Sequence, residues 1–296
     1  MAKVLILGGA GFIGSNLKRS LVVAGHDVET PPIDILDYEA LLKMFAKERW
    51  EWVLHLAGVS HVATCEQDPA NALRVNVLGT SNILETMRRA APQAHLIFSS
   101  TAQVYRPPTD GKPLDEDGSI APWNMYARAK AAAEALIRQY CDNGDLSATV
   151  LRLFNHTHSS QPPNFFLPEI YRRLKTAVET GEQVVSVGNL DLLRDIGSIQ
   201  DLCRAFDQLL QAKHRLGQFE VFNLCSGSAK SLRLIAQQVA ERIGARVDFR
   251  LDESRLRPGE PACIVGSSDK LSRTIGWSSQ CRTEVDLVNN FFESLR

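Results

Sequence analysis

The chain has 296 residues, of which 44% are hydrophobic and 23% charged, a composition typical of a folded protein with a full core. Its 33 Lys and Arg residues nearly balance its 34 Asp and Glu residues, so no field of one sign favours nucleic acid or a membrane surface. An anionic ligand must therefore be held by a few placed groups.

Short apolar runs alternate with amphipathic stretches through the first half of the chain. Strands are predicted over residues 3–8, 26–30, 52–58, 95–100 and 147–155. Helices are predicted over residues 12–25, 38–49, 70–92 and 125–144. Because the strands are nearly continuously apolar, the alternation indicates an α/β fold with a doubly wound parallel sheet covered on both faces.

The texture changes after residue 155, where residues 156–169 are rich in Pro, Ser and His and are expected to form a loop. Helices follow over residues 170–181, 199–213, 230–244 and 284–296, with strands over 219–227 and 246–252. We predict that residues 1–154, together with about 190–215, form the sheet domain. Residues 155–189 and 216–296 are expected to form a smaller C-terminal α/β lobe.

A glycine-rich turn follows the first strand and opens the first helix. Gly8, Gly11 and Gly14 are spaced as G-x-x-G-x-x-G. Such glycines allow a tight turn, a close approach of backbone to a pyrophosphate, and packing of helix on strand. The helix that begins at Phe12 and Ile13 then offers its N-terminus to the diphosphate. The pattern predicts a dinucleotide site in a sheet of the Rossmann type.

The end of the second strand bears on the choice of dinucleotide. An NAD enzyme usually has Asp or Glu there to bind the ribose 2′-hydroxyl, but here the strand runs into Pro31 and Pro32. No carboxylate repels a 2′-phosphate and no arginine grips one, so NADP(H) is favoured and NAD(H) is possible. Asp34 and Ile35 open the next loop, where the carboxylate either hydrogen-bonds adenine or caps a helix.

Tyr126 and Lys130 lie four residues apart on the predicted helix and therefore share one face. A lysine ammonium near a phenol favours the phenolate and lowers its pKa, which makes the tyrosine usable as an acid or base near neutral pH. The lysine can also reach a nicotinamide ribose. Thr101 stands at the end of a strand upstream, where its hydroxyl can bond the reacting oxygen. The three side chains predict carbonyl–alcohol chemistry.

These motifs together give the chain a resemblance to the extended short-chain dehydrogenase/reductase family over essentially its whole length. The matching pieces are residues 8–14, 34–37, 55–62, 76–85, 99–105, 126–130, 154–157, 194–195 and 257–260. Within that family the chain is most similar to enzymes that act on GDP-linked 4-keto-6-deoxy-mannose. That similarity rests on residues 151–170, 188–206, 221–227 and 257–277. It implies that the sheet domain binds NAD(P) and the lobe a nucleotide sugar.

The resemblance also implies roles for individual residues. Thr101, Tyr126 and Lys130 match the catalytic residues of the family. Besides Tyr126 and Lys130, the residues that match the cofactor site are Gly8, Gly11, Phe12, Ile13, Gly14, Asp34, Ile35, Leu56, Ala57, Gly58 and Asn76. The residues that match the substrate site are Gln103, Asn155, Asn164, Arg194, Arg257 and Glu260.

In this match Asn155 is the amide next to the substrate diphosphate, and Arg194 and Arg257 are the two arginines that clamp it. Guanidinium forks suit phosphate oxygens, and a chain of near-neutral charge needs such a local clamp. The alternative is that Arg194 and Asp195 form an ordinary surface pair and Arg257 is solvated.

Two positions decide which reaction the resemblance implies. Dehydratases of this family carry a Glu, often beside an Asp, where this chain has Gln103 and Ala102. Enzymes that epimerise C3 and C5 carry a cysteine where this chain has Gln103. Neither Ala102 nor Gln103 can transfer a proton, so reduction of a C4 ketone is favoured. A nucleotide-sugar 4-epimerase with tightly bound NAD is the alternative, and a non-catalytic NAD(P)-binding sensor is less favoured.

Composition and motifs also bear on partners and location. The six cysteines are scattered and none are spaced as C-x-x-C, which favours free thiols in a reducing, cytoplasmic compartment over a disulfide or zinc framework. No apolar run is long enough to span a membrane, and no metal site is expected. Related enzymes often dimerise through two helices, here residues 72–89 and 129–140, so a homodimer is expected.

Overall fold

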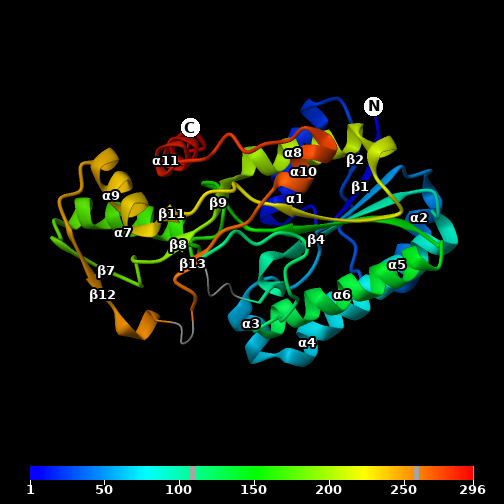
Figure 1. Cartoon of the computed structure of the whole chain (residues 1–296), viewed down its shortest axis with the longest axis horizontal. Coiled ribbons are helices and arrows are strands. Elements are labelled where there is room, and N and C mark those ends of the chain that lie inside the picture. Colours follow the sequence, from blue (N-terminus) through cyan, green and yellow to red (C-terminus); the bar gives the residue numbers. More distant parts are fainter. Residues whose placement is uncertain (107–110, 257–259, 296) are drawn as a thin grey trace.

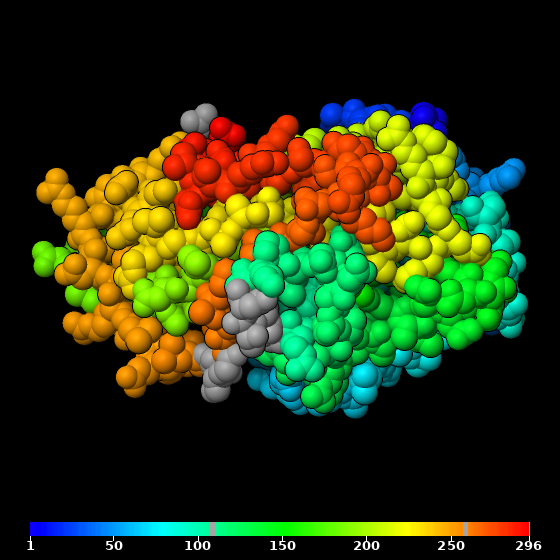
Figure 2. Space-filling model, in the orientation of Figure 1, coloured from blue at the N-terminus to red at the C-terminus, as the bar shows by residue number. Residues whose placement is uncertain are grey.

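Figure 1 shows the computed structural model, which describes residues 1–106, 111–256 and 260–295. A large parallel sheet flanked by helices occupies one end of the molecule, and a smaller lobe occupies the other. The space-filling view in Figure 2 shows the same division, with orange and yellow segments of the lobe at the left. The α/β class predicted from the alternation of strands and helices is confirmed.

The large sheet has six parallel strands: β1 Lys3–Leu7, β2 Asp27–Glu29, β3 Trp52–His55, β4 His95–Thr101, β5 Ser147–Leu153 and β10 Phe219–Leu224. They lie in the order β10-β5-β4-β3-β1-β2. The chain passes from β2 back across β1 to β3, so the carboxyl ends of β1 and β3 flank a topological switch point. Ligands of such sheets bind at that edge.

Helices cover both faces of this sheet: α1 Phe12–Val23, α2 Tyr38–Lys47, α3 Val62–Gln67, α4 Pro69–Leu73, α5 Gly79–Ala90, α6 Met125–Asp142, α8 Ile199–Gln211 and α10 Asp269–Ile275. A π-helical turn, Arg74–Leu78, joins α4 to α5. α1, α8 and α10 share one buried apolar cluster with the sheet, and α2, α5 and α6 share another. Burial of these two clusters is the main stabilising term of the domain.

The lobe is built from three helices and several short strands: α7 Phe166–Thr180, α9 Leu232–Ile243, α11 Glu284–Glu293, β6 Asn155–Thr157, β7 Val184–Val187, β8 Leu193–Arg194, β9 Ile196–Ser198, β11 Lys230–Ser231, β12 Asp248–Leu251 and β13 Cys263–Ile264. Three 3-10 turns complete the chain: Ala102–Val104, Lys213–Arg215 and Glu253–Arg255. β8 lies between β11 and β13, β7 pairs with β12, and β6 pairs with β9. The three helices enclose a third apolar cluster.

The position of β10 differs from the sequence-based boundary. Residues 216–296 were expected to lie in the lobe, but β10 pairs in parallel with β5 as the edge strand of the large sheet, and α10 packs on the same sheet. Residues of about 190–215 were expected in the sheet domain, but β8 and β9 pair with strands of the lobe. Phe222 and Leu224 of β10 are buried in the same cluster as α8. The apolar pattern of a strand does not depend on which sheet the strand joins, so the sequence did not identify the pairing partner of β10.

Three further features concern ligands and location. All six cysteines are free thiols. In the part of the chain that the structure describes, His, Cys, Asp and Glu side chains do not gather in the groups of three that would hold a metal ion. Among the described residues there is no helix with the length and apolarity needed to cross a bilayer.

Candidate active site

The glycine turn after β1 has the geometry expected of a dinucleotide cradle. Gly8 has φ +89°, and a Cβ there would lie 2.5 Å from the backbone nitrogen of Ala57. A Cβ at Gly14 would collide with the carbonyl oxygen of Gly8. By contrast Gly11, the N-cap of α1, is exposed, and a Cβ there would lie 3.4 Å from the carbonyl oxygen of Gly8, without a collision. Two glycines are therefore required by packing, and the third leaves the helix N-terminus open to a ligand.

The turn after β3 forms the other side of this cradle. Asn76, from the π-helical turn, accepts a hydrogen bond from Val59 N (2.9 Å) and donates one to Val59 O (3.0 Å). Gly58 has φ +151°, and a Cβ there would collide with Asn76 Oδ1 and lie 3.9 Å from Lys130 Nζ. Leu56 and Ala57 are partly buried beside it. This turn thus brings the predicted cofactor residues next to Lys130.

Asp34 and Ile35 lie in the loop before α2. Ile35 is buried against Gly79, and its carbonyl oxygen accepts a bond from Asn82. Asp34 is exposed, and its Oδ1 accepts a bond from Leu36 N (2.9 Å). The cap of α2 is Asp37, which accepts from Ala40 N, so the helix-capping reading of Asp34 was wrong. The adenine contact of Asp34 stays a prediction.

Thr101 and Tyr126 are brought together, as the sequence predicted. Thr101 is the last residue of β4 and is buried, and its Oγ1 accepts a hydrogen bond from Gln103 N (3.2 Å). The Thr101 hydroxyl also hydrogen-bonds the phenol of Tyr126, and this contact lowers the pKa of the phenol. A bond that favours the phenolate is one donated to the phenol oxygen. Thr101 therefore links the end of β4 to the reactive face of α6.

Lys130 lies on the same face of α6, one turn further along. Its ammonium is buried, donates to the carbonyl oxygen of Ser99 (2.8 Å), and lies 4.5 Å from the ring centroid of Phe98. Burial lowers the pKa of Lys130 to about 8, although Glu134 raises it. The lysine is thus anchored to β4 by its bond to Ser99.

The expectation that Lys130 lowers the pKa of Tyr126 was wrong. Burial raises the pKa of Tyr126 to about 12, and the bond from Thr101 offsets this only in part. The ammonium of Lys130 donates to Ser99 O, and Lys130 does not contribute to the shift of the Tyr126 pKa. Below pH 12 the phenol therefore keeps its proton, which suits a proton donor.

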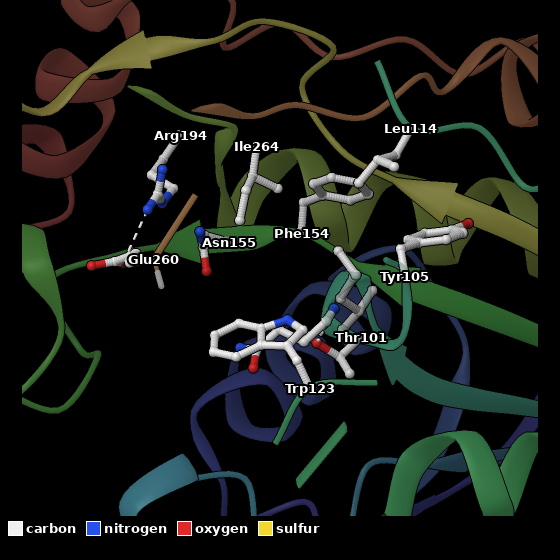
Figure 3. Close-up of a pocket in the computed structure, with 12 residues that line it drawn as sticks. Thr101, Tyr105, Leu114, Trp123, Phe154, Asn155, Arg194, Glu260 and Ile264 are labelled. Atoms are coloured by element: carbon white, nitrogen blue, oxygen red, sulfur yellow. Dashed lines mark hydrogen bonds and ion pairs between the residues drawn. The ribbon is translucent and has the colours of Figure 1, made fainter. Parts of the chain in front are cut away.

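A pocket opens beyond this face of α6 and reaches the lobe. Figure 3 shows Thr101 near one end and Arg194 and Glu260 near the other. Its lining residues are Thr101, Ala102, Gln103, Tyr105, Leu114, Trp123, Leu153, Phe154, Asn155, Arg194, Glu260 and Ile264. The lining includes four of the predicted substrate residues: Gln103, Asn155, Arg194 and Glu260.

Arg194 is the cation at the lobe end of the pocket. It is buried in β8, and its Nη2 donates to Glu260 Oε1 (3.0 Å) while Nη1 donates to the carbonyl oxygens of Leu193 (2.8 Å) and Ala262 (3.3 Å). The neighbouring Asp195 accepts bonds elsewhere, from Ser226, Gly227 and Gly266. The alternative of a surface Arg194–Asp195 pair was therefore wrong.

Two predicted substrate residues are not placed in the pocket. Asn164 is exposed in the loop before α7 and does not line it. Arg257, the second predicted clamp residue, lies outside the described residues. Of the residues predicted to bind the substrate diphosphate, the described part of the pocket therefore contains Arg194 and Asn155.

Sequence reasoning missed two side chains next to the site. Trp123 lines the pocket with 41% of its surface exposed, and Asn124 is the N-cap of α6. The available signal was their position directly before Met125 and Tyr126, at the start of the helix that carries the tyrosine. An exposed tryptophan beside a pocket is unusual enough to mark a binding surface.

The sheet, the glycine turn and the Thr-Tyr-Lys arrangement define an extended short-chain dehydrogenase/reductase of the kind that acts on nucleotide sugars. The chain belongs to the family described as GDP-mannose 4,6 dehydratase, whose model matches residues 28–288.

Two relatives and one solved structure illustrate the range of the family. GDP-6-deoxy-D-mannose reductase of Pseudomonas aeruginosa is 28% identical and aligns over 94% of this chain and 92% of its own length. UDP-glucose 4-epimerase of Corynebacterium glutamicum is also 28% identical, over 94% and 91%. The structure of RMD from Pseudomonas aeruginosa complexed with NADPH superposes with a TM-score of 0.87 at 26% identity, over 98% of both chains.

Proposed function

We propose that this chain reduces the C4 ketone of a nucleotide-linked 4-keto-6-deoxy-hexose, with GDP-4-keto-6-deoxy-mannose as the favoured substrate and NAD(P)H as the reductant. The carrying observation is that Tyr126 is hydrogen-bonded to Thr101, and that Thr101 lines a pocket together with Ala102 and Gln103. These residues supply one proton donor and no second acid.

The residues of the cradle fit a dinucleotide. The backbone packs closely at three glycines, where a Cβ would collide with a neighbouring residue: Gly8, Gly14 and Gly58. A Cβ at Gly11 would not collide, so the N-terminus of α1 stays accessible to a ligand. When bound there, the reduced nicotinamide supplies a hydride to the carbonyl carbon. Lys130, whose ammonium lies under Gly58, would hold the ribose hydroxyls.

We favour NADP(H) over NAD(H). The expectation that no carboxylate stands at the end of the second strand was wrong, because β2 ends on Glu29. Its carboxylate pairs with Lys3 (3.5 Å) and Lys47 (3.6 Å), and the two ammonium groups offset its charge. Thr30 packs directly against Gly9 and offers only a hydroxyl. A comparison of kcat/KM for NADPH and NADH tests this preference, and a higher value for NADH would reverse it.

In the proposed reaction Tyr126 donates its proton to the C4 oxygen as negative charge develops there. A pKa of about 12 keeps the phenol protonated at neutral pH, yet a C4 alkoxide is basic enough to take the proton. Thr101, whose Oγ1 lies against the phenol, steadies the resulting phenolate. The carbonyl of Ser99 and the charge of Lys130 fix this face of α6.

The same site disfavours the other reactions of the family. Loss of water across C5 and C6, and epimerisation at C3 or C5, each need another group that exchanges a proton with carbon. Ala102 and the amide of Gln103 cannot do so. The substrate diphosphate would be bound by Arg194 and Asn155 at the lobe end of the pocket.

A 4-epimerase is the second candidate, supported by the epimerase relative. It must first remove a proton from the C4 hydroxyl, a step that starts from the phenolate form of Tyr126, whereas reduction starts from the protonated phenol. The test is to add NADPH and GDP-4-keto-6-deoxy-mannose to the purified protein and follow absorbance of the reduced cofactor. Loss of absorbance supports the reductase; interconversion of GDP- or UDP-hexoses without added cofactor would replace it with the epimerase.

A further inference from the structure

Asn124 carries two hydrogen bonds that run in opposite directions. As the N-cap of α6, its Oδ1 accepts from Ala127 N (2.8 Å). Its Nδ2 donates to Oε1 of Gln103 (2.7 Å), on the 3-10 turn after β4. Asn124 is buried, so both contacts are shielded from water.

The first bond decides the direction of the second. A backbone N–H at a helix N-terminus needs an acceptor, so the oxygen of Asn124 must face Ala127 and its NH₂ must face Gln103. The atom of Gln103 that meets this NH₂ must in turn be its oxygen. The amide of Gln103 therefore directs Nε2 away from Asn124, and none of the described residues accepts a bond from it.

Gln103 lines the pocket, and the bond from its N–H to Thr101 Oγ1 places its backbone next to the last residue of β4. A ligand bound in this pocket can therefore accept a hydrogen bond from its Nε2. The backbone of Gln103 is fixed as well, because its N–H donates to Thr101 Oγ1. Gln103 is thus held through its backbone N–H and through its side-chain Oε1. The two N–H groups of Nε2 remain as donors.

We propose that Asn124 is a positioning residue that makes Gln103 a hydrogen-bond donor to an oxygen of the hexose beside C4. This inference rests on the proposed function, since it concerns the sugar end of the same site. It assigns sugar recognition to the capping residue of the helix that carries Tyr126. A donor amide can orient a sugar oxygen but cannot exchange a proton with carbon. Gln103 would therefore fix the orientation of the hexose and would not act as an acid or base.

The variant Asn124→Asp tests the proposal without a change at position 103. Aspartate caps a helix as well as asparagine, so α6 keeps its acceptor for Ala127 N. The Gln103 amide then turns its NH₂ toward the new carboxylate and presents Oε1 to the sugar. We expect about tenfold weaker binding of GDP-mannose by calorimetry, the loss typical of one hydrogen bond, with affinity for GDP alone and for NADPH unchanged.

A double-mutant cycle separates positioning from a general structural effect. In the Gln103→Leu background, Asn124→Asp should cause no further loss of GDP-mannose binding, because it acts through the amide that has been removed. Asn124→Ser, which keeps the cap and leaves Gln103 unoriented, should fall between the native chain and Asn124→Asp. Equal losses with and without Gln103, or equal losses for GDP and GDP-mannose, would overturn the proposal.

The same measurement distinguishes the inference from the proposed function. If GDP-mannose binds and the cycle shows coupling, but no keto-sugar is reduced, the reductase assignment fails and the positioning role stands. If neither GDP-mannose nor UDP-glucose binds the native chain, the nucleotide-sugar site fails and both proposals are overturned.

Discussion

The guanidinium of Arg194 and the carboxylate of Glu260 form an ion pair 3.0 Å long at the end of the pocket away from Thr101 (Figure 3). The arginine side chain is 9% exposed and the glutamate 25%. Without Glu260 the buried cation would depend on two backbone carbonyls. Glu260 thus holds the cation in place for an anionic ligand to meet.

The first prediction concerns this arginine. Arg194→Lys keeps the charge but loses the fork that meets two phosphate oxygens, so KM for the nucleotide sugar should rise by one to two orders of magnitude with little change in kcat. Steady-state kinetics with saturating NADPH measure both constants. Affinity for NADPH is the control, and a loss there in place of the sugar effect would contradict the placement of Arg194.

The second prediction separates two tyrosines whose pKa is raised to about 12 by desolvation of the phenol, Tyr126 and Tyr105. Tyr126→Phe removes the proton donor, so kcat should fall by 10²–10⁴ while NADPH still binds. Tyr105 OH instead bonds Asn223 (2.7 Å) and receives a bond from Arg152 (3.0 Å).

Tyr105→Phe is therefore the matched control. It leaves buried partners unsatisfied and should cost about 1–3 kcal/mol of unfolding free energy, measured by urea denaturation, with kcat nearly unchanged. If Tyr105→Phe abolished turnover and Tyr126→Phe did not, the assignment of the proton donor would be wrong.

How much of this site the sequence predicted depends on the range of each interaction. The glycine turn and the pairing of Tyr126 with Lys130 are local patterns, set by one turn and one helix period, and both were predicted. The bond from Asn124 to Gln103 joins residues 21 apart and arises only when α6 docks at the end of β4. No spacing rule reports such a contact.

The sign of the pKa shift at Tyr126 could not be predicted for a related reason. The sequence places a cation four residues away, which favours a lowered pKa. The fold decides otherwise, because it buries the phenol and directs Lys130 to Ser99 O. Burial and hydrogen-bond partners are properties of the packed chain, so the charge pattern alone gave the wrong direction.

The third prediction is a pH dependence of stability that arises from Lys130. Its pKa is lowered from 10.5 to about 8, so between these values the unfolded chain binds more protons than the folded chain. Stability contributed through this group therefore rises as pH increases from about 8 to about 10.5. Relative to Lys130→Met, the native chain should gain up to about 3 kcal/mol of unfolding free energy across this window.

Urea denaturation of both proteins at pH 7.5 and pH 10.5 measures this difference, and the subtraction cancels groups common to the two. Lys43, which is exposed on α2, provides the control: Lys43→Met should show no such change. A gap between native chain and Lys130→Met that stays constant with pH would mean that the lysine is not desolvated.

The fourth prediction concerns Thr101, whose hydroxyl accepts from Gln103 N and bonds the phenol of Tyr126. Thr101→Ala removes the bond that lowers the pKa of the phenol, so the phenolate left after proton transfer is less stable. We expect kcat to fall by 10- to 100-fold, with unfolding free energy reduced by only about 1 kcal/mol. Thr101→Ser restores the hydroxyl and should recover most of the rate. Among the described residues, Thr101 is the side chain that hydrogen-bonds the phenol of Tyr126. An unchanged kcat in Thr101→Ala would therefore mean that the end of β4 does not assist Tyr126.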